Sequence, residues 1–305
     1  MASQPWQAEV SVHTELARAL LGTVAPELAD LSLTRLGEGW DNTVFLVDDR
    51  MTLRFPRRAM ALPAAEAEWA ALSALAGRLP VEVPVPRLRG QPALGFPWPF
   101  AGYSMVQGQT ACRAALGPLA RARLAGPLGA LLAALHRVPP ADAPGLGEDP
   151  LEKANLARRW PAIEGWLAEA RALGLLDEAL ADRARRGMAE AAATPWQGRA
   201  RRLTHGDLYI RHLIVDADHA LTGVIDWGDA CWGDPAVDVA VAFSCLPPDA
   251  RGAFWAAYGA IDRTTERLAR GRALFSGLAI LIYGHHQDQP DLVREGRFGL
   301  NWAST

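Results

Sequence analysis

The chain contains almost no lysine. Lys153 is the only one among 305 residues, and arginine supplies the rest of the 31 basic side chains. Lys153 follows a stretch rich in proline and glycine and lies far from any predicted strand. Because it is the only lysine, a positive charge on a strand must come from arginine. The acidic residues number 34, and the resulting net charge of −3 argues against a general nucleic-acid or membrane-surface binder.

Cysteine and long apolar runs are scarce as well. The three cysteines are odd in number and show no metal-ligand spacing, which predicts reduced thiols and a cytoplasmic protein. No apolar run reaches the roughly 20 residues that a membrane helix needs. The first ten residues, MASQPWQAEV, lack the basic and apolar regions of a signal peptide. Half of all residues are hydrophobic, so the chain is predicted to be globular, and its length suffices for two lobes.

The most informative stretch is LTHGDLYIRHLIVDADHALTGVIDWGDACWGDPAVDVAV, residues 203–241. Residues 213–215 predict a short strand, residues 216–219 a turn, and residues 221–225 the return strand. A polar loop containing His-Gly-Asp precedes this hairpin, and a helix is predicted to follow it.

The ends of this hairpin carry groups that suit catalysis. His212 comes just before the first strand, Asp226 just after the second, and Asp207 a few residues further back. Because a hairpin brings its two ends together, the three side chains are predicted to converge. Two carboxylates and an imidazole can hold a divalent cation and take up a proton, which suits transfer of a phosphoryl group to a hydroxyl.

The segments HGDLYIRHLIVD and GVIDWGDACWGDPAVDVA resemble the aminoglycoside phosphotransferase family, small-molecule kinases with a protein-kinase-like fold. The resemblance implies an α+β, bilobal fold. Its small N-terminal lobe, a mixed five-stranded sheet with one helix, would span residues 1–105 and bind the nucleotide. Its larger, mainly helical C-terminal lobe, residues 106–305, would hold the catalytic residues and the acceptor.

The resemblance also assigns roles to residues. Asp207 would orient or deprotonate the acceptor hydroxyl, while His212 and Asp226 would hold Mg²⁺ for an ATP or GTP donor. The first metal position is usually asparagine, and the histidine here resembles the macrolide-phosphorylating branch. Mg²⁺ prefers oxygen ligands, whereas imidazole suits softer metal ions. The histidine therefore makes Mn²⁺ an alternative to Mg²⁺. His205 is predicted to be structural, and Asp238 to tie down the catalytic loop.

The N-terminal region predicts a helix over residues 12–28 and strands at 31–36 and 43–47. Gly37 and Gly39 lie in the turn between the two strands. Glycines let backbone N–H groups approach phosphates closely, so the turn is a candidate nucleotide-binding loop. A plain hairpin turn is the alternative.

Arg54 lies on a third predicted strand, residues 51–55, where protein kinases place a phosphate-binding lysine. The following helix, residues 63–76, carries Glu68 at helical spacing with its inward leucines. An inward glutamate needs a partner, because an unpaired buried charge is costly. We therefore predict that Arg54 pairs with Glu68 and holds the nucleotide phosphates; Glu66 is the competing partner.

A further strand is predicted at residues 100–108, after proline-rich loop and edge-strand material. In the family this segment joins the lobes and meets the purine. The resemblance thus assigns Met105, Val106 and Gln107 to the purine slot, although a plain buried strand would account for these side chains equally well.

The C-terminal region predicts helices at 118–138, within 151–193, at 249–260 and at 266–284. Gly126-Pro127 is expected to kink or break the first of them. His285 and His286 are not expected to form a metal cluster, since adjacent side chains on a helix point apart. Together with Asp291 and Glu295, they are instead candidates to border the acceptor pocket; the role of Asp229 stays open.

The sequence thus predicts an ATP- or GTP-dependent O-phosphotransferase acting on a small molecule, such as an aminoglycoside or macrolide antibiotic. One alternative is a metabolic kinase of an amino alcohol, a sugar or a homoserine-like compound. Another is a nucleotide-binding protein without catalysis, given the departures at Arg54 and His212. The acceptor, the preference between ATP and GTP, and the oligomeric state stay open.

Overall fold

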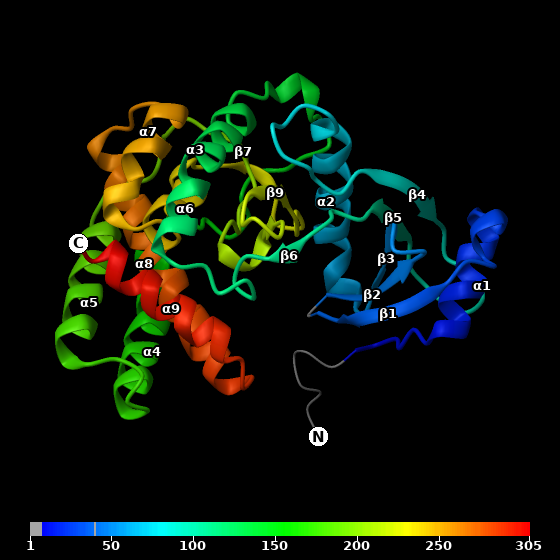
Figure 1. Cartoon of the computed structure of the whole chain (residues 1–305), viewed down its shortest axis with the longest axis horizontal. Coiled ribbons are helices and arrows are strands. Elements are labelled where there is room, and N and C mark those ends of the chain that lie inside the picture. Colours follow the sequence, from blue (N-terminus) through cyan, green and yellow to red (C-terminus); the bar gives the residue numbers. More distant parts are fainter. Residues whose placement is uncertain (1–7, 40) are drawn as a thin grey trace.

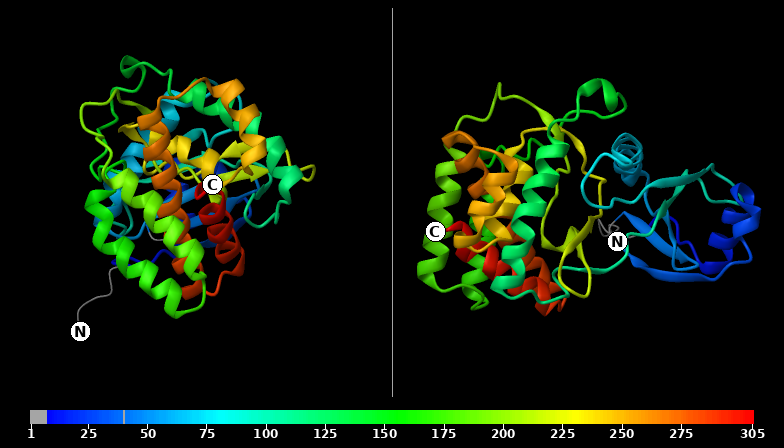
Figure 2. Two further views of the ribbon diagram at one scale, coloured as in Figure 1. Left: turned by 90° about the vertical axis from the view of Figure 1, so that its left-hand side faces the viewer. Right: turned by 45° about the horizontal axis from the view of Figure 1, so that its top comes forward.

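The computed structural model describes residues 8–39 and 41–305 and has two lobes (Figure 1). Residues 1–7, where no signal peptide was predicted, and Trp40 of the glycine turn lie outside the described residues. One lobe is built on a β-sheet and the other is mainly helical (Figures 1 and 2). The predicted bilobal kinase-like fold is confirmed, while the predicted boundary between residues 105 and 106 stays a prediction.

A five-stranded sheet forms the first lobe, in the order β1-β2-β3-β5-β4. The strands are β1 (Leu33–Glu38), β2 (Asn42–Val47), β3 (Met51–Pro56), β4 (Pro86–Gly90) and β5 (Phe100–Ser104). Every neighbouring pair is antiparallel, so the prediction of a mixed sheet was wrong in this detail. The connection through α2 does bring β4 parallel to β3, but β5 lies between these two strands and pairs antiparallel with both. The proline-containing strand β4 lies at an edge, as predicted.

The alternation of side chains along β3 divides residues between the two faces of the sheet. Leu53 and Phe55 are fully buried in a cluster with Leu20 and Leu21 of α1 (Thr14–Val24). Arg54, which lies between these two residues, therefore points to the opposite face, where α2 (Leu62–Leu75) packs. The alternation thus places the Arg54 side chain under α2.

The second lobe contains most of the helices. They are α3 (Pro118–Leu135), α4 (Trp160–Ala172), α5 (Glu178–Ala192), α6 (Ala236–Ser244), α7 (Arg251–Tyr258), α8 (Arg263–His286) and α9 (Pro290–Ala303). A kink or a break was predicted at Gly126-Pro127; α3 stays helical through Pro127, so no break occurs there. Close packing of α3 on α7 holds the helix in this region: a Cβ at Gly129 would lie 2.4 Å from the backbone oxygen of Phe254 in α7. The last helix, α9, was not predicted.

The chain also forms two small sheets. Their strands are β6 (Gln109–Thr110), β7 (Arg202–Thr204), β8 (Leu213–Val215), β9 (Leu221–Val224) and β10 (Cys231–Gly233). β8 and β9 form the predicted antiparallel hairpin, which β6 extends, while β7 pairs with β10. The backbone of Glu82 is hydrogen-bonded to the hairpin at Thr222 and Val224. The hairpin accordingly lies between the sheet lobe and the helices (Figure 2).

Short 3₁₀ turns complete the described elements; they are Pro26–Leu28, Ala59–Ala61, Pro140–Asp142, Ala157–Arg159, Ile210–His212 and Pro248–Ala250. Within the described part of the chain, no helix has the length and apolar character needed to cross a membrane. All three cysteines are buried and free.

Candidate active site

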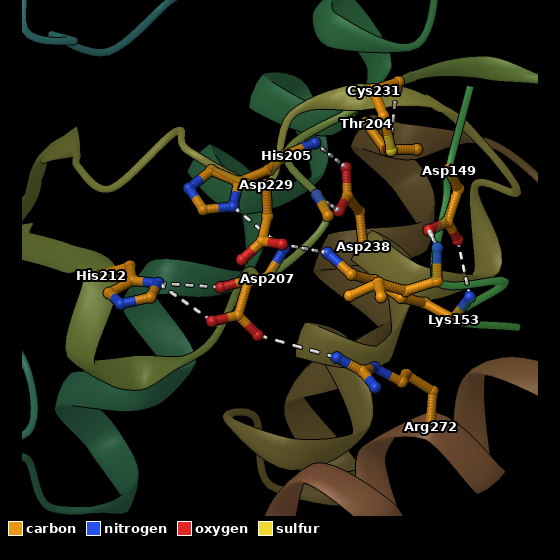
Figure 3. A network of polar contacts seen from close by, with 12 residues as sticks. Asp149, Lys153, Thr204, His205, Asp207, His212, Asp229, Cys231, Asp238 and Arg272 are labelled. Atoms are coloured by element: carbon orange, nitrogen blue, oxygen red, sulfur yellow. Dashed lines mark hydrogen bonds and ion pairs between the residues drawn. The ribbon is translucent and has the colours of Figure 1, made fainter. Parts of the chain in front are cut away.

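The ends of the β8–β9 hairpin bring the predicted residues together. His212 Nε2 lies 3.1 Å from Asp226 Oδ2, and His212 Nδ1 lies 4.0 Å from Asp207 Oδ2. The Nδ1 atom is 2.8 Å from the main-chain oxygen of Asp207, so it donates a hydrogen bond there. The other ring nitrogen, Nε2, faces the Asp226 carboxylate, to which it donates when the imidazole is protonated. The convergence inferred from the hairpin is therefore present in the structure. Figure 3 shows the part of it formed by His212 and Asp207.

The electrostatics of this pair are strongly coupled. Burial by itself would lower the pKa of His212, but the Asp226 carboxylate outweighs it and the pKa is raised. Partial desolvation of its half-exposed carboxyl group would raise the pKa of Asp226, yet the charges of His212 and Arg54 hold the pKa well below its usual range. Asp226 also has a positive φ of 69°, an uncommon backbone conformation for a residue with a side chain. Such outliers concentrate at functional sites, where the surrounding structure holds them.

Asp238 fixes the loop that carries Asp207. Its carboxylate accepts hydrogen bonds from the backbone N–H groups of His205 (2.8 Å) and Gly206 (2.9 Å). His136 Nε2 lies 3.2 Å from the same carboxylate, a support that the sequence did not reveal. Gly206 has a φ of 82°, and a Cβ there would lie 2.2 Å from the backbone oxygen of Asp229. The contacts match the predicted tie-down of the loop, and only glycine fits at its centre.

His205 is enclosed on all sides within this loop. Its Nε2 donates to the backbone oxygen of Ile225 at 3.0 Å, and its Nδ1 accepts from Asp207 N at 3.3 Å. Burial lowers the pKa of His205, and the neighbouring His212 adds to this effect. A neutral imidazole with both nitrogens engaged matches the predicted structural role.

Arg54 and Glu68 form a buried ion pair of 2.6 Å between β3 and α2. Glu66, the competing candidate, instead pairs with Arg89. Burial raises the pKa of Glu68, although Arg54 acts against this rise. The Glu68 carboxylate also accepts from the backbone N–H of Trp227 at 3.3 Å. Since Trp227 follows Asp226 directly, this contact joins the ion pair to the end of the hairpin.

We expect Arg54→Met to weaken nucleotide binding about 10- to 100-fold, because a charge-assisted hydrogen bond to a phosphate would be lost. Titration calorimetry with ATP and GTP measures the effect. Arg89→Met is the matched control, since this arginine also pairs with a glutamate of α2 but on the exposed side. Equal losses in the two variants would contradict the phosphate role of Arg54.

The other residues assigned to the nucleotide lie on the sheet lobe and on the segment that follows β5. Gly37 sits in an irregularity of the β1–β2 pairing with a φ of 156°, and Gly39 N donates to the backbone oxygen of Asn42. Met105 N donates to the backbone oxygen of Arg50, so the segment after β5 stays tied to the β2–β3 turn. Val106 is buried and Gln107 is exposed. Phosphate and purine binding by these residues stay predictions.

The structure adds two cations that the sequence did not place at the site. Lys153 is buried, and its Nζ lies 2.6 Å from Asp229 Oδ1, beside the catalytic loop (Figure 3). Arg272 of α8 has its Nη2 at 3.6 Å from Asp207 Oδ1. Arg272 lies on the buried stripe of α8, so the inward-charge argument used for Glu68 would have found it. Lys153 gave no such signal, because it lies in an irregular segment between α3 and α4, where no helical spacing applies.

Three residues that were considered for the acceptor pocket are either buried in an ion pair or exposed at the surface. Glu295, a candidate to border this pocket, is buried and paired with Arg121 at 2.6 Å, so its carboxylate is not available to an acceptor. His286 is exposed and contacts Glu169 at 2.6 Å. His285 is also exposed. Within the described residues, no group of three or more histidine, cysteine or acidic side chains could hold a metal ion.

The residues at the hairpin nevertheless fit a nucleotide-bound divalent ion. Asp226 offers carboxylate oxygen, and His212, held through Nδ1, would offer Nε2 to the ion in place of the proton that it shares with Asp226. Two protein ligands suit Mg²⁺, which commonly keeps several waters and binds substrate phosphates.

A two-lobed, kinase-like fold with a convergent acid–imidazole site defines a phosphotransferase. The model of the phosphotransferase enzyme family matches residues 32–273, and the chain belongs to this family. It is a small-molecule kinase with the predicted fold class.

Known relatives agree with this assignment. The uncharacterized protein YcbJ of Bacillus subtilis (strain 168) is 29% identical over 231 residues, which is 73% of this chain and 72% of that protein. The GDP and kanamycin complex of APH(2")-IIIa is 27% identical with a TM-score of 0.66, covering 94% of this chain and 97% of that one. Apo macrolide 2'-phosphotransferase MphH from Brachybacterium faecium is 26% identical with a TM-score of 0.59, covering 93% and 98%.

Proposed function

We propose that this protein transfers the γ-phosphoryl group of ATP or GTP to a hydroxyl of a small molecule, with Asp207 as the base. The observation that carries the proposal is the meeting of Asp207, His212 and Asp226 at one end of a hairpin. The Arg54–Glu68 pair is joined to the same point through Trp227. Phosphoryl transfer depends mainly on positioning and charge neutralisation, and this arrangement provides both.

Each group has a distinct task in this proposal. Asp207 aims the acceptor hydroxyl at the γ-phosphorus and takes up its proton. His212 and Asp226 hold a divalent ion, which would neutralise charge on the β- and γ-phosphates when bound. Arg54 holds phosphate oxygens, and Gly37 and Gly39 offer backbone N–H groups. The segment Met105 to Gln107 would contact the purine, and a cytoplasmic location would supply the nucleotide.

The histidine among the metal ligands gives a specific prediction. We expect Mn²⁺ to support turnover at least as well as Mg²⁺, because imidazole suits softer ions than Mg²⁺. Turnover with each ion, measured side by side at equal free concentration, checks this. His212→Asn is the comparison variant and should shift the preference toward Mg²⁺, since its amide offers oxygen. Wild-type activity with Mg²⁺ alone would contradict the metal role of His212.

Two classes of acceptor deserve a direct test. An aminoglycoside or a macrolide is suggested by two similar solved structures, of which one is a kanamycin complex and the other is a macrolide 2'-phosphotransferase. A metabolic hydroxyl compound is favoured by the positions of Lys153 and Arg272 beside the catalytic loop, which are unfavourable for a polycation. Release of ADP or GDP, measured over a panel of antibiotics, sugars, amino alcohols and hydroxy acids, separates the two classes.

The same assay tests the proposal as a whole. Phosphorylated product identified by mass spectrometry, formed with ATP or GTP and dependent on a divalent ion, is the expected result. Tight nucleotide binding without transfer to any acceptor would instead favour a non-catalytic nucleotide-binding protein.

A further inference from the structure

Arg272 has unused hydrogen-bonding capacity next to the catalytic carboxylate. Its side chain is only 10% exposed, and its nearest charged partner is Asp207 at 3.6 Å, beyond hydrogen-bond distance. Its Nε atom is buried without a partner, and within residues 8–39 and 41–305 its guanidinium forms no hydrogen bond. Its other contact is the Phe275 ring, whose centre lies 5.3 Å from the guanidinium carbon.

Burying the Arg272 guanidinium without hydrogen bonds costs free energy unless a ligand supplies acceptors for its N–H groups. A guanidinium carries five N–H donors, and burying a charge without hydrogen bonds is unfavourable. Burial lowers the pKa of Arg272, although the charge of Asp207 acts against this. The donors of Arg272 are therefore available to a ligand that brings oxygen atoms.

Apart from Asp207, which is the proposed base, the neighbouring acids are already engaged and cannot receive a cation equally well. Asp229 binds Lys153 at 2.6 Å, and Asp149 accepts hydrogen bonds from the backbone N–H groups of Leu151 and Lys153. Arg159 lies near enough to Arg272 to lower its pKa, and its own Nε is also buried without a partner. The unsatisfied capacity of this cluster thus consists of donors, so an ammonium group would meet like charge there.

The placement of Arg272 identifies the side of Asp207 on which an acceptor binds. Oδ2 of Asp207 faces His212, and Oδ1 faces Arg272, so the two basic groups lie on different sides of the carboxylate (Figure 3). The His212 side leads to Asp226 and the proposed nucleotide. A group bound by Arg272 would therefore lie on the acceptor side and within a few bonds of the reacting hydroxyl.

We propose that Arg272 is an acceptor-binding residue and that the acceptor is a hydroxy acid whose carboxylate binds the Arg272 guanidinium. The planar fork of arginine matches a carboxylate bidentately. This inference rests on the proposed phosphotransferase function. In the reaction, the hydroxyl oxygen bonds to the γ-phosphorus as the bond from phosphorus to the β–γ bridging oxygen breaks. The proton passes to Asp207, the nucleoside diphosphate leaves with the electron pair, and the carboxylate is unchanged.

Binding of matched compounds tests this directly. Each set consists of a hydroxy acid, its amide and the amine of equal length, for example 4-hydroxybutanoate, 4-hydroxybutanamide and 4-amino-1-butanol, with the series extended over chain length and branching. Calorimetry is carried out on the full chain with GDP or ADP present. We expect the acids to bind best, and Arg272→Gln to weaken the acids about 10- to 100-fold while changing the amides less than about threefold.

Two further variants make the test specific. Arg267→Gln removes an exposed arginine from the same helix and should leave acid binding unchanged. Arg272→Lys retains the charge without the fork and should give intermediate affinity, which also serves if Arg272→Gln folds poorly. Unchanged nucleotide affinity in each variant shows that the fold is intact.

The outcomes separate this inference from the proposed function. No carboxylate-dependent binding across the series, or equal weakening of acid, amide and amine by Arg272→Gln, would overturn the assignment of Arg272. Acids that bind through Arg272 but are never phosphorylated would support that assignment and reject the phosphotransferase proposal. Where turnover occurs, the substitution should raise the KM for the acid more than it lowers kcat, because Arg272 binds the acceptor and not the transferred group.

Discussion

Asp207→Asn is expected to lower kcat of phosphoryl transfer about 10²- to 10⁴-fold, the usual contribution of a positioned general base. The amide keeps the size and the backbone contacts of the residue but cannot take up the hydroxyl proton. Nucleotide affinity should change less than about twofold, because the contacts proposed for the nucleotide come from other residues. Single-turnover kinetics and calorimetry measure the two quantities separately.

Asp218→Asn provides the control for this experiment. It removes one carboxylate from the exposed β8–β9 turn of the same hairpin, so it reproduces the change in net charge at a distance from the site. We expect its kcat to equal that of the wild type. Retained turnover in Asp207→Asn would refute the role of Asp207 as base, whereas loss of nucleotide binding would indicate a damaged loop.

Arg121→Met is expected to lower the free energy of unfolding by about 3–5 kcal/mol, because it leaves the carboxylate of Glu295 buried without its main partner. Both side chains are 1% exposed, and the pair joins α3 to α9 at 2.6 Å. Arg121 also donates to the backbone oxygens of Leu116 and Cys245. Its guanidinium lies over the rings of Phe298 and Trp302, at 5.1 and 5.2 Å from their centres. Urea unfolding followed by circular dichroism measures the loss.

The double variant Arg121→Met/Glu295→Leu separates the charge effect from packing. It should be more stable than Arg121→Met alone, since no uncompensated charge remains. The exposed pair of Arg185 and Glu164 is the comparison, because Arg185→Met should cost less than about 1 kcal/mol. A loss below about 1 kcal/mol in Arg121→Met would show that the buried pair contributes little to holding α9.

Local patterns predicted the elements whose partners are close in sequence. The hairpin between His212 and Asp226 followed from two apolar runs and a turn, and its closure forces the two side chains together. The pairing of Arg54 with Glu68 followed from helical spacing and the cost of an unpaired inward charge. Both inferences succeed because one short-range geometric rule, period 2 or period 3.6, fixes the direction of each side chain.

The sequence by itself therefore determined the family, the lobes and the residues around the proposed metal and phosphates. Only the tertiary structure decided which charges face one another across long separations. It shows that Glu295, a candidate for the pocket border, is buried in an ion pair with Arg121. It also shows that Lys153 and Arg272 lie beside the catalytic loop. The physical reason is that no local period specifies how α8 and α9 pack against that loop. The acceptor side of the site is built from such packing.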